Sequence, residues 1–187
     1  MTLPEKYSKP AVILHWLIAL GVLFNLITME VLGDDSRPRS LIDLHKSIGI
    51  TVIGLVLLRI LWRVAHRPPA LPVTYKPWES WLSHAVHYLL YFMLFAMPLT
   101  GWIMNSASMN KNTGQPYPIV LYHLVPWFNL PLFDGMAASA RKSWHETFGA
   151  GHSIGGWILL ALLALHVVGA LKHQFIDKEK ELQRMWF

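Results

Sequence analysis

The sequence predicts an all-α membrane protein, built as a bundle of four transmembrane helices in a single domain over residues 1–187. Hydrophobic residues make up 53% of the chain and charged residues only 14%, whereas about a quarter of the residues in a typical soluble domain are charged. The apolar residues gather in four segments, and each can reach the roughly 20 residues that a helix needs to cross the hydrocarbon core. A soluble protein with buried helices would not combine four such segments with so few charges.

The four helices are expected at about residues 11–32, 41–64, 81–104 and 146–174. Their apolar stretches read AVILHWLIALGVLFNLITMEVL, SIGITVIGLVLL, YLLYFMLFAMPLTGWIM and SIGGWILLALLALHVVGAL. The first stretch is too long for a cleavable signal peptide, and no small-residue cleavage site follows it. We therefore expect an uncleaved signal anchor.

Three loops are expected between these helices, at residues 33–40, 65–80 and 105–141. Four prolines interrupt each of the last two loops, which excludes a long helix from either. The C-terminal residues ELQRMWF are expected to form an interfacial tail, because Trp and Phe suit the headgroup region.

Basic residues indicate the orientation in the membrane. With four spans, both termini and the second loop share one side, which carries ten of the 16 Lys and Arg residues. This bias predicts that both termini lie in the cytoplasm. The net charge of +5 is then explained by topology and phospholipid contact, and it gives no reason to expect nucleic acid as a partner.

Histidines inside the predicted spans are the main functional signal, because a polar metal-binding side chain is costly in lipid. His166 lies well inside the fourth span, and His152 precedes it by fourteen residues. Fourteen helical steps return to within roughly 40° of the same face and cover about 21 Å. One side of the fourth helix therefore presents two histidines near opposite edges of the membrane.

Two further histidines face this pair. His15 lies early in the first helix, near the cytoplasmic side, and His45 lies early in the second, near the opposite side. We expect His15 to meet His166 and His45 to meet His152, which gives the axial ligands of two stacked, six-coordinate haems between the helices. Glycines three or four residues after three of these histidines would let a flat macrocycle approach the backbone; they are Gly49, Gly156 and Gly169.

Other metal chemistry is less well supported. The chain has no cysteine, so it holds no iron–sulfur cluster and no covalently attached haem, and any haem is of the non-covalent b type. A zinc site at His84, His87 or His123 would lack an accompanying carboxylate cluster. No metalloprotease, Walker or dinucleotide-binding motif is present.

Several motifs resemble the prokaryotic cytochrome b561 family of four-helix dihaem membrane cytochromes over nearly the whole chain. They read ILHW (13–16), LHKSIGI (44–50), LRILWR (58–63), HYLLYFMLFAMPLTGW (87–102) and LHVVGALKHQFIDK (165–178). The resemblance implies two bis-histidine haem b groups, ubiquinone as a partner within the membrane, and the inner (cytoplasmic) membrane of a bacterium as the location. In at least one member the implied activity is oxidation of superoxide at the outer surface, with electrons passed to ubiquinone.

One motif departs from the family pattern. Some members carry SWHET with its histidine fourteen residues before the last ligand, whereas here that histidine, His145, precedes His166 by twenty-one residues. Twenty-one residues span roughly 31 Å, which would place the two ligands at the extreme edges of the core. His152 restores the fourteen-residue spacing and is preferred, with His145 as the rival ligand.

Supporting roles are assigned to three further side chains. Arg59 and Arg63, at the cytoplasmic end of the second helix, suit haem propionates, although positive-inside anchoring explains them equally well. His87 is a candidate contact to a propionate or quinone, although a structural role explains it at least as well. A basic patch over the outer haem would steer a small anionic reductant such as superoxide, although solvated or snorkelling side chains explain the same residues equally well; its members are Lys46, Arg141, Lys142 and His145.

The expected function is electron transfer between a donor at the outer face and the membrane quinone pool, and no residue is assigned as catalytic. One alternative is a cytochrome anchor that relays the electrons of a dehydrogenase or hydrogenase. A remote alternative is a haem-free metal or proton transporter lined by histidines.

Overall fold

The computed structural model describes residues 6–31, 38–70 and 74–186. The structure contains four long helices: α1 (Lys9–Leu26), α2 (Arg39–Ala65), α3 (Pro77–Ala107) and α4 (Ala138–Leu171). Single π-helical turns continue α1 over Ile27–Val31 (η1) and α4 over Lys172–Ile176 (η3). All four helices are long and apolar enough to span a membrane, which confirms the predicted bundle of a multi-pass membrane protein.

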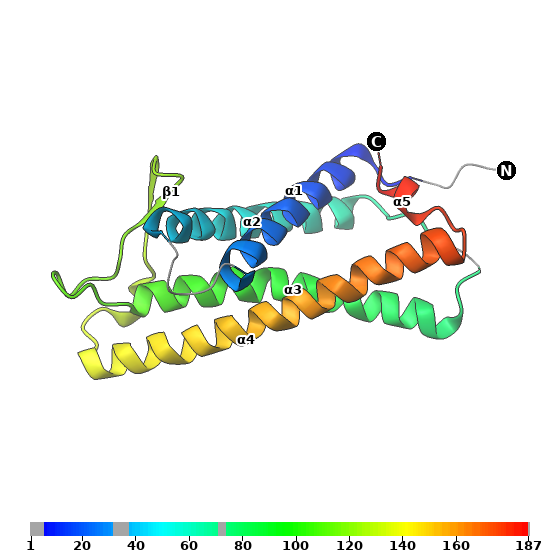
Figure 1. Cartoon of the computed structure of the whole chain (residues 1–187). Coiled ribbons are helices and arrows are strands. Elements are labelled where there is room, and N and C mark those ends of the chain that lie inside the picture. Colours follow the sequence, from blue (N-terminus) through cyan, green and yellow to red (C-terminus); the bar gives the residue numbers. More distant parts are fainter. Residues whose placement is uncertain (1–5, 32–37, 71–73, 187) are drawn as a thin grey trace.

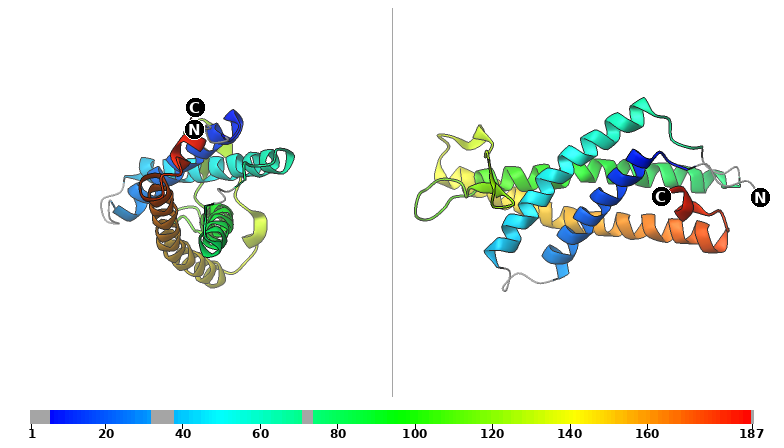
Figure 2. Two further views of the ribbon diagram at one scale, coloured as in Figure 1. Left: turned by 90° about the vertical axis from the view of Figure 1, so that its right-hand side faces the viewer. Right: turned by 90° about the horizontal axis from the view of Figure 1, so that it is seen from above.

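The helices pack in two layers. α3 packs lengthwise on α4, α1 packs on α2, and α2 contacts α3. Seen from above, α1 and α2 run obliquely across the α3–α4 pair (Figures 1 and 2). An added Cβ at Gly155 would lie 2.6 Å from Sδ of Met97, so this glycine lets α4 approach α3 closely.

The interior of the bundle is apolar, and so is much of its outer surface. Val52, Val56, Met93 and Leu159 are buried where the helices meet. Large apolar side chains nevertheless remain exposed on the helices, among them Leu61 at 66%. Such exposure is expected of surfaces that lipid tails cover.

The two longest helices begin earlier than predicted. α3 begins at Pro77 instead of residue 81, and α4 begins at Ala138 instead of residue 146. The polar residues before each apolar stretch were assigned to loops, but a helix can continue into water once the membrane ends. α4, with 34 residues, is about 51 Å long against a hydrocarbon core of about 30 Å.

The long loop before α4 contains a small sheet. Strands β1 (Ile119–Leu121) and β2 (Val125–Trp127) pair antiparallel, and a 3-10 turn, η2, follows at Pro131–Phe133. The backbone N–H of Tyr122 donates to Oγ of the fully buried Ser47, at 2.9 Å, so the hairpin is fixed to the start of α2. We call this the hairpin end of the bundle.

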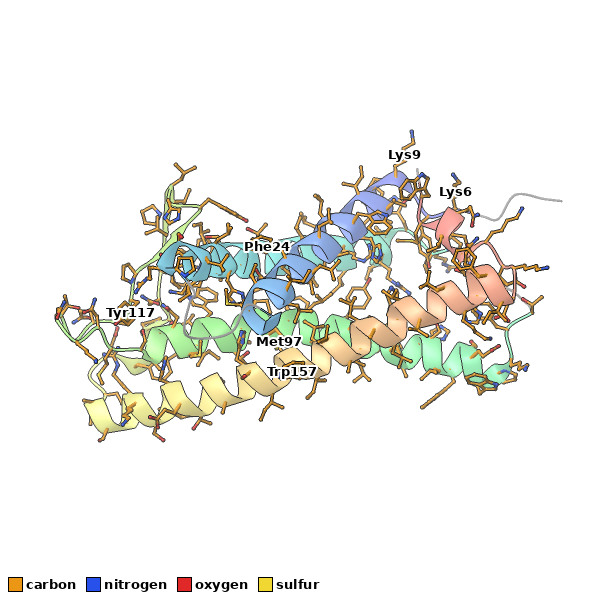
Figure 3. All side chains as sticks on the ribbon, viewed as in Figure 1. Lys6, Lys9, Phe24, Met97, Tyr117 and Trp157 are labelled. Atoms are coloured by element: carbon orange, nitrogen blue, oxygen red, sulfur yellow. The ribbon has the colours of Figure 1, made fainter. Side chains whose placement is uncertain are left out.

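The start of α1 and the short helix α5 (Glu181–Arg184) lie together at the opposite end, the terminal end (Figure 1). In Figure 3, Lys6 and Lys9 mark this end and Tyr117 marks the hairpin end. The C-terminal tail thus forms a short helix that contacts the N-terminal segment. The Tyr7 N–H donates to the Arg184 carbonyl, and Trp16 Nε1 donates to the Met185 carbonyl.

Candidate functional site

The first histidine pair lies near the hairpin end. His45 comes from the second turn of α2 and His152 from the middle of α4, and their ring centroids are 6.0 Å apart with an interplanar angle of 85°. The predicted meeting of these two side chains is therefore observed. Each ring comes from a different membrane-spanning helix, so the pair bridges the two layers.

The second pair lies toward the terminal end. His15 of α1 and His166 of α4 have ring centroids 6.2 Å apart, at an interplanar angle of 67°. Because His152 and His166 are fourteen residues apart on α4, the two pairs are separated by about 21 Å along that helix. The structure thus brings all four predicted histidines into two facing pairs at two levels.

These separations can be compared with the distance between two imidazole rings that bind one metal ion from opposite sides. A metal–imidazole bond is about 2.0–2.1 Å long and the bonded nitrogen lies about 1.1 Å from the ring centre, so two imidazoles on opposite sides of one ion have centroids about 6.3 Å apart. The observed 6.0 and 6.2 Å agree with this value. Neutral imidazoles are also suitable axial donors for haem iron. The residues of both pairs therefore fit a bis-histidine haem.

A cavity of about 570 Å³ surrounds the His45–His152 pair. Glycines of three helices line it, where the lack of a side chain lets the backbone lie close to the cavity; they are Gly49, Gly101, Gly149 and Gly156. Gly49 and Gly156 were expected from their spacing to the histidines. The sequence does not single out Gly101 and Gly149, because their closeness to the site depends on how α3 and α4 pack.

Gly101 makes the closest approach to a histidine. An added Cβ there would lie 3.0 Å from Cε1 of His152, tighter than ordinary van der Waals contact. At Gly169, three residues after His166, an added Cβ would meet nothing within 4 Å. The space beside Gly169 is therefore not filled by described residues of the protein, and the expected approach of a macrocycle there stays a prediction.

His145 occupies a different position from His152. It lines the same cavity, and its Nδ1–H donates to the Met104 carbonyl at 2.9 Å. The ring that faces His45 is that of His152. This arrangement supports His152 over His145 as the partner of His45.

The third helix places His87 beside the second pair. The His87 ring lies 5.2 Å from that of His166, and its Nδ1–H donates to the Ser83 carbonyl at 2.6 Å. His84, one turn earlier, is exposed and donates to the Ser80 carbonyl. Of these two histidines, His87 is the one that reaches the site.

Arg59 and Arg63 have partners within the protein. Arg59 donates to the Ala11 carbonyl at 2.7 Å and to the Tyr91 hydroxyl at 3.1 Å. The Arg63 guanidinium lies over the Tyr91 ring, 5.9 Å from its centroid. Arg59 therefore links α1, α2 and α3 close to the level of His15.

The four basic residues expected over the first pair do not form one cluster. Lys46 and His145 line the cavity, and Lys46 Nζ is 3.6 Å from an Asp43 carboxylate oxygen. Arg141 instead donates to the Ser108 carbonyl, and the exposed Lys142 pairs with Glu146 at 3.7 Å. Only the first two can act directly on a molecule in the cavity.

A polar cluster at the terminal end was not foreseen. Lys172 pairs with both Glu79 and Asp177, and His173 Nδ1 lies 2.7 Å from Asp177 Oδ2. Hydrogen bonding from the Lys172 ammonium, and then from His173, holds the pKa of Asp177 below its ordinary value. Burial and the nearby Glu181 raise the pKa of Tyr75, whose ring stacks on His173 at 4.1 Å.

Comparisons with known proteins agree with this architecture. The model of a family described as prokaryotic cytochrome b561 matches residues 6–187. Cytochrome b561 homolog 2 of Escherichia coli (strain K12) is 33% identical over 186 residues, which cover 97% of this chain and 92% of that protein. The probable superoxide oxidase CybB of Yersinia pestis is 25% identical over 185 residues, covering 97% and 96% of the two chains. Cytochrome b561 homolog 1 of Escherichia coli (strain K12) is 26% identical over 185 residues, 97% of each chain.

Proposed function

Since this chain belongs to the prokaryotic cytochrome b561 family and is a membrane electron-transfer protein, we propose that it is a dihaem cytochrome linking an electron donor at the outer face to the membrane quinone pool. The observation that carries this proposal is that two histidine pairs, His15–His166 and His45–His152, lie at two levels of one bundle. A single metal site would explain one histidine pair but not both.

The chain's own residues would hold and shield two haem b groups. His45 and His152 would bind the haem near the hairpin end, and His15 and His166 the haem near the terminal end. Haem b supplies one-electron exchange, and two such groups can store the two electrons that reduction of a quinone requires.

Arg59, Arg63 and His87 are assigned to the haem near the terminal end. An arginine fork suits a propionate carboxylate, and Arg59 already lies at the level where α1, α2 and α3 meet. His87, whose ring is 5.2 Å from that of His166, is placed to contact a propionate or a quinone.

Superoxide is the donor that we propose for the hairpin end. A relative in Yersinia pestis is named a probable superoxide oxidase, and Lys46 places a positive charge at the cavity around His45 and His152. Two superoxide ions would each lose one electron to become dioxygen, and one ubiquinone would take up two electrons and two protons to become ubiquinol. With both termini in the cytoplasm of a bacterium, the hairpin end faces away from the cytoplasm.

The test has two stages. A reduced-minus-oxidised spectrum and a haem count on the purified protein should show a b-type α-band and two haems per chain. Superoxide generated beside the protein should then reduce ubiquinone at a rate that superoxide dismutase abolishes. Absence of the α-band would overturn the cytochrome assignment. Two haems without superoxide-driven reduction, together with a stoichiometric soluble partner, would establish the relay-subunit alternative instead.

A further inference from the structure

We infer that Thr100 is a positioning residue for His152: its hydroxyl fixes which ring nitrogen carries the proton, so that Nε2 is the nitrogen offered to iron. The inference rests on the proposed function, because it takes His152 as a haem ligand. It adds a residue to which the sequence alone assigns no role. Thr100 lies in α3, opposite His152 of α4, and the two side chains meet at 3.0 Å between Oγ1 and Nδ1.

The direction of this hydrogen bond follows from the other contacts of the hydroxyl. Thr100 Oγ1 lies 2.8 Å from the Ala96 carbonyl oxygen and 2.9 Å from the Met97 carbonyl oxygen. Carbonyl oxygens only accept, so the single hydroxyl proton is directed to one of them. With its proton so placed, the Thr100 oxygen accepts from His152, and the donor is Nδ1–H, which the Met97 carbonyl of the same helix also attracts.

A neutral imidazole with a proton on Nδ1 has its free lone pair on Nε2. Metal-bound histidines usually donate their other ring N–H to a fixed acceptor, which sets both the tautomer and the ring orientation. Thr100 supplies this acceptor from a different helix, so the ring orientation depends on the packing of α3 against α4.

Gly101 also contacts the His152 imidazole. An added Cβ at Gly101 would lie 3.0 Å from Cε1, 3.5 Å from Nδ1 and 3.7 Å from Nε2 of His152. The backbone of α3 therefore lies against the edge of the imidazole that adjoins the hydrogen-bonded nitrogen. One residue holds Nδ1 and its neighbour limits rotation, which maintains the angle of 85° between the His152 and His45 rings.

The experiment compares Thr100→Val, which keeps the shape of the side chain but removes the acceptor, with Thr100→Ser, which keeps the hydroxyl. Thr28→Val is the matched control, because the Thr28 hydroxyl also bonds carbonyls of its own helix, those of Phe24 and Asn25, in a buried position. The readouts are the midpoint potentials of the two haems, the low-spin ferric EPR signals and the haem content per chain.

Thr100→Val should change one haem and leave the other as in the parent protein. Loss of a second-sphere partner typically weakens metal binding about 10–100-fold. Because donation by Nδ1–H raises the basicity of the ligand, its loss disfavours ferric iron more, and the potential of that haem should rise. A tenfold difference between the two oxidation states corresponds to about 59 mV for one electron. Thr100→Ser should restore the parent potential, and Thr28→Val should not shift it.

Gly101→Ala provides a second route, because its added methyl should push the ring and alter the EPR signal of the same haem. Gly54→Ala is its control, since an added Cβ at Gly54 meets nothing within 4 Å. If Thr100→Val and Gly101→Ala leave both potentials and both EPR signals unchanged while His152→Ala loses a haem, the positioning role is wrong and the ligand assignment stands. If His152→Ala keeps both haems, the ligand assignment itself is wrong, and this inference falls with it.

Discussion

His152→Ala and His145→Ala separate the two candidates for the fourth haem ligand. Removing the His152 imidazole leaves His45 without the ring that now lies 6.0 Å from it. His145 cannot replace that ring, because seven helical residues place it about 10 Å further along α4. We therefore expect His152→Ala to retain one haem per chain instead of two.

His145→Ala should have a much smaller effect. It removes one hydrogen bond, to the Met104 carbonyl, which typically contributes about 0.5–1.5 kcal/mol. Both haems should remain. The assay is a pyridine haemochrome count against protein concentration, together with a redox titration that resolves the two haems. Retention of both haems by His152→Ala, with loss of one by His145→Ala, would refute the pairing of His45 with His152.

Three further changes test the fold. Val56→Ala should lower the free energy of unfolding in detergent by about 1–2 kcal/mol, because Val56 is fully buried and the surrounding side chains would only partly fill the space left by its two methyl groups. Ser47→Ala removes the acceptor for the Tyr122 N–H, so proteolysis of the 119–127 hairpin should become faster, consistent with a loss of about 1 kcal/mol. The lowered pKa of Asp177 means that its pairing with Lys172 stabilises the protein above the ordinary carboxyl range and is lost as the pH falls through the folded-state pKa. The thermal unfolding midpoint should therefore decrease once the pH falls below about 4. Asp177→Asn should make the midpoint depend less on pH in this range.

Each of these changes has a control or a contrary result. Leu57→Ala, at the neighbouring but 47% exposed position, should cost less than Val56→Ala. Equal cleavage of Ser47→Ala and the parent protein would show that the hairpin is held by other contacts. An unchanged acid profile in Asp177→Asn would assign the acid sensitivity to another carboxylate.

The membrane-spanning helices could be predicted from the sequence because the signal is local. Four apolar stretches of sufficient length, separated by proline-rich loops, specify four spans without any knowledge of their packing. The starts of α3 and α4 were less accurate, since hydropathy marks where the membrane ends and not where the helix ends. The polar first turns at Pro77 and Ala138 lie outside that signal.

The relative positions of the two histidines on α4 could also be predicted from the sequence, because rise and rotation per residue are fixed within one helix. His152 and His166 were therefore placed on one face and at two depths from the sequence alone. Their partners, His15 and His45, were inferred from the antiparallel order of the spans, and the structure brings both pairs together.

Contacts between helices were decided only by the tertiary structure. Thr100 and Gly101 reach His152 because of the angle and register at which α3 packs on α4, and no pattern within α3 records that register. The cluster of Lys172, Asp177 and Tyr75 likewise joins segments distant in sequence. The sequence by itself determined four spans and two levels of histidines, since both follow from the geometry of single helices. The tertiary structure decided which atoms meet across the bundle, because that depends on the tilt and approach of one helix against another.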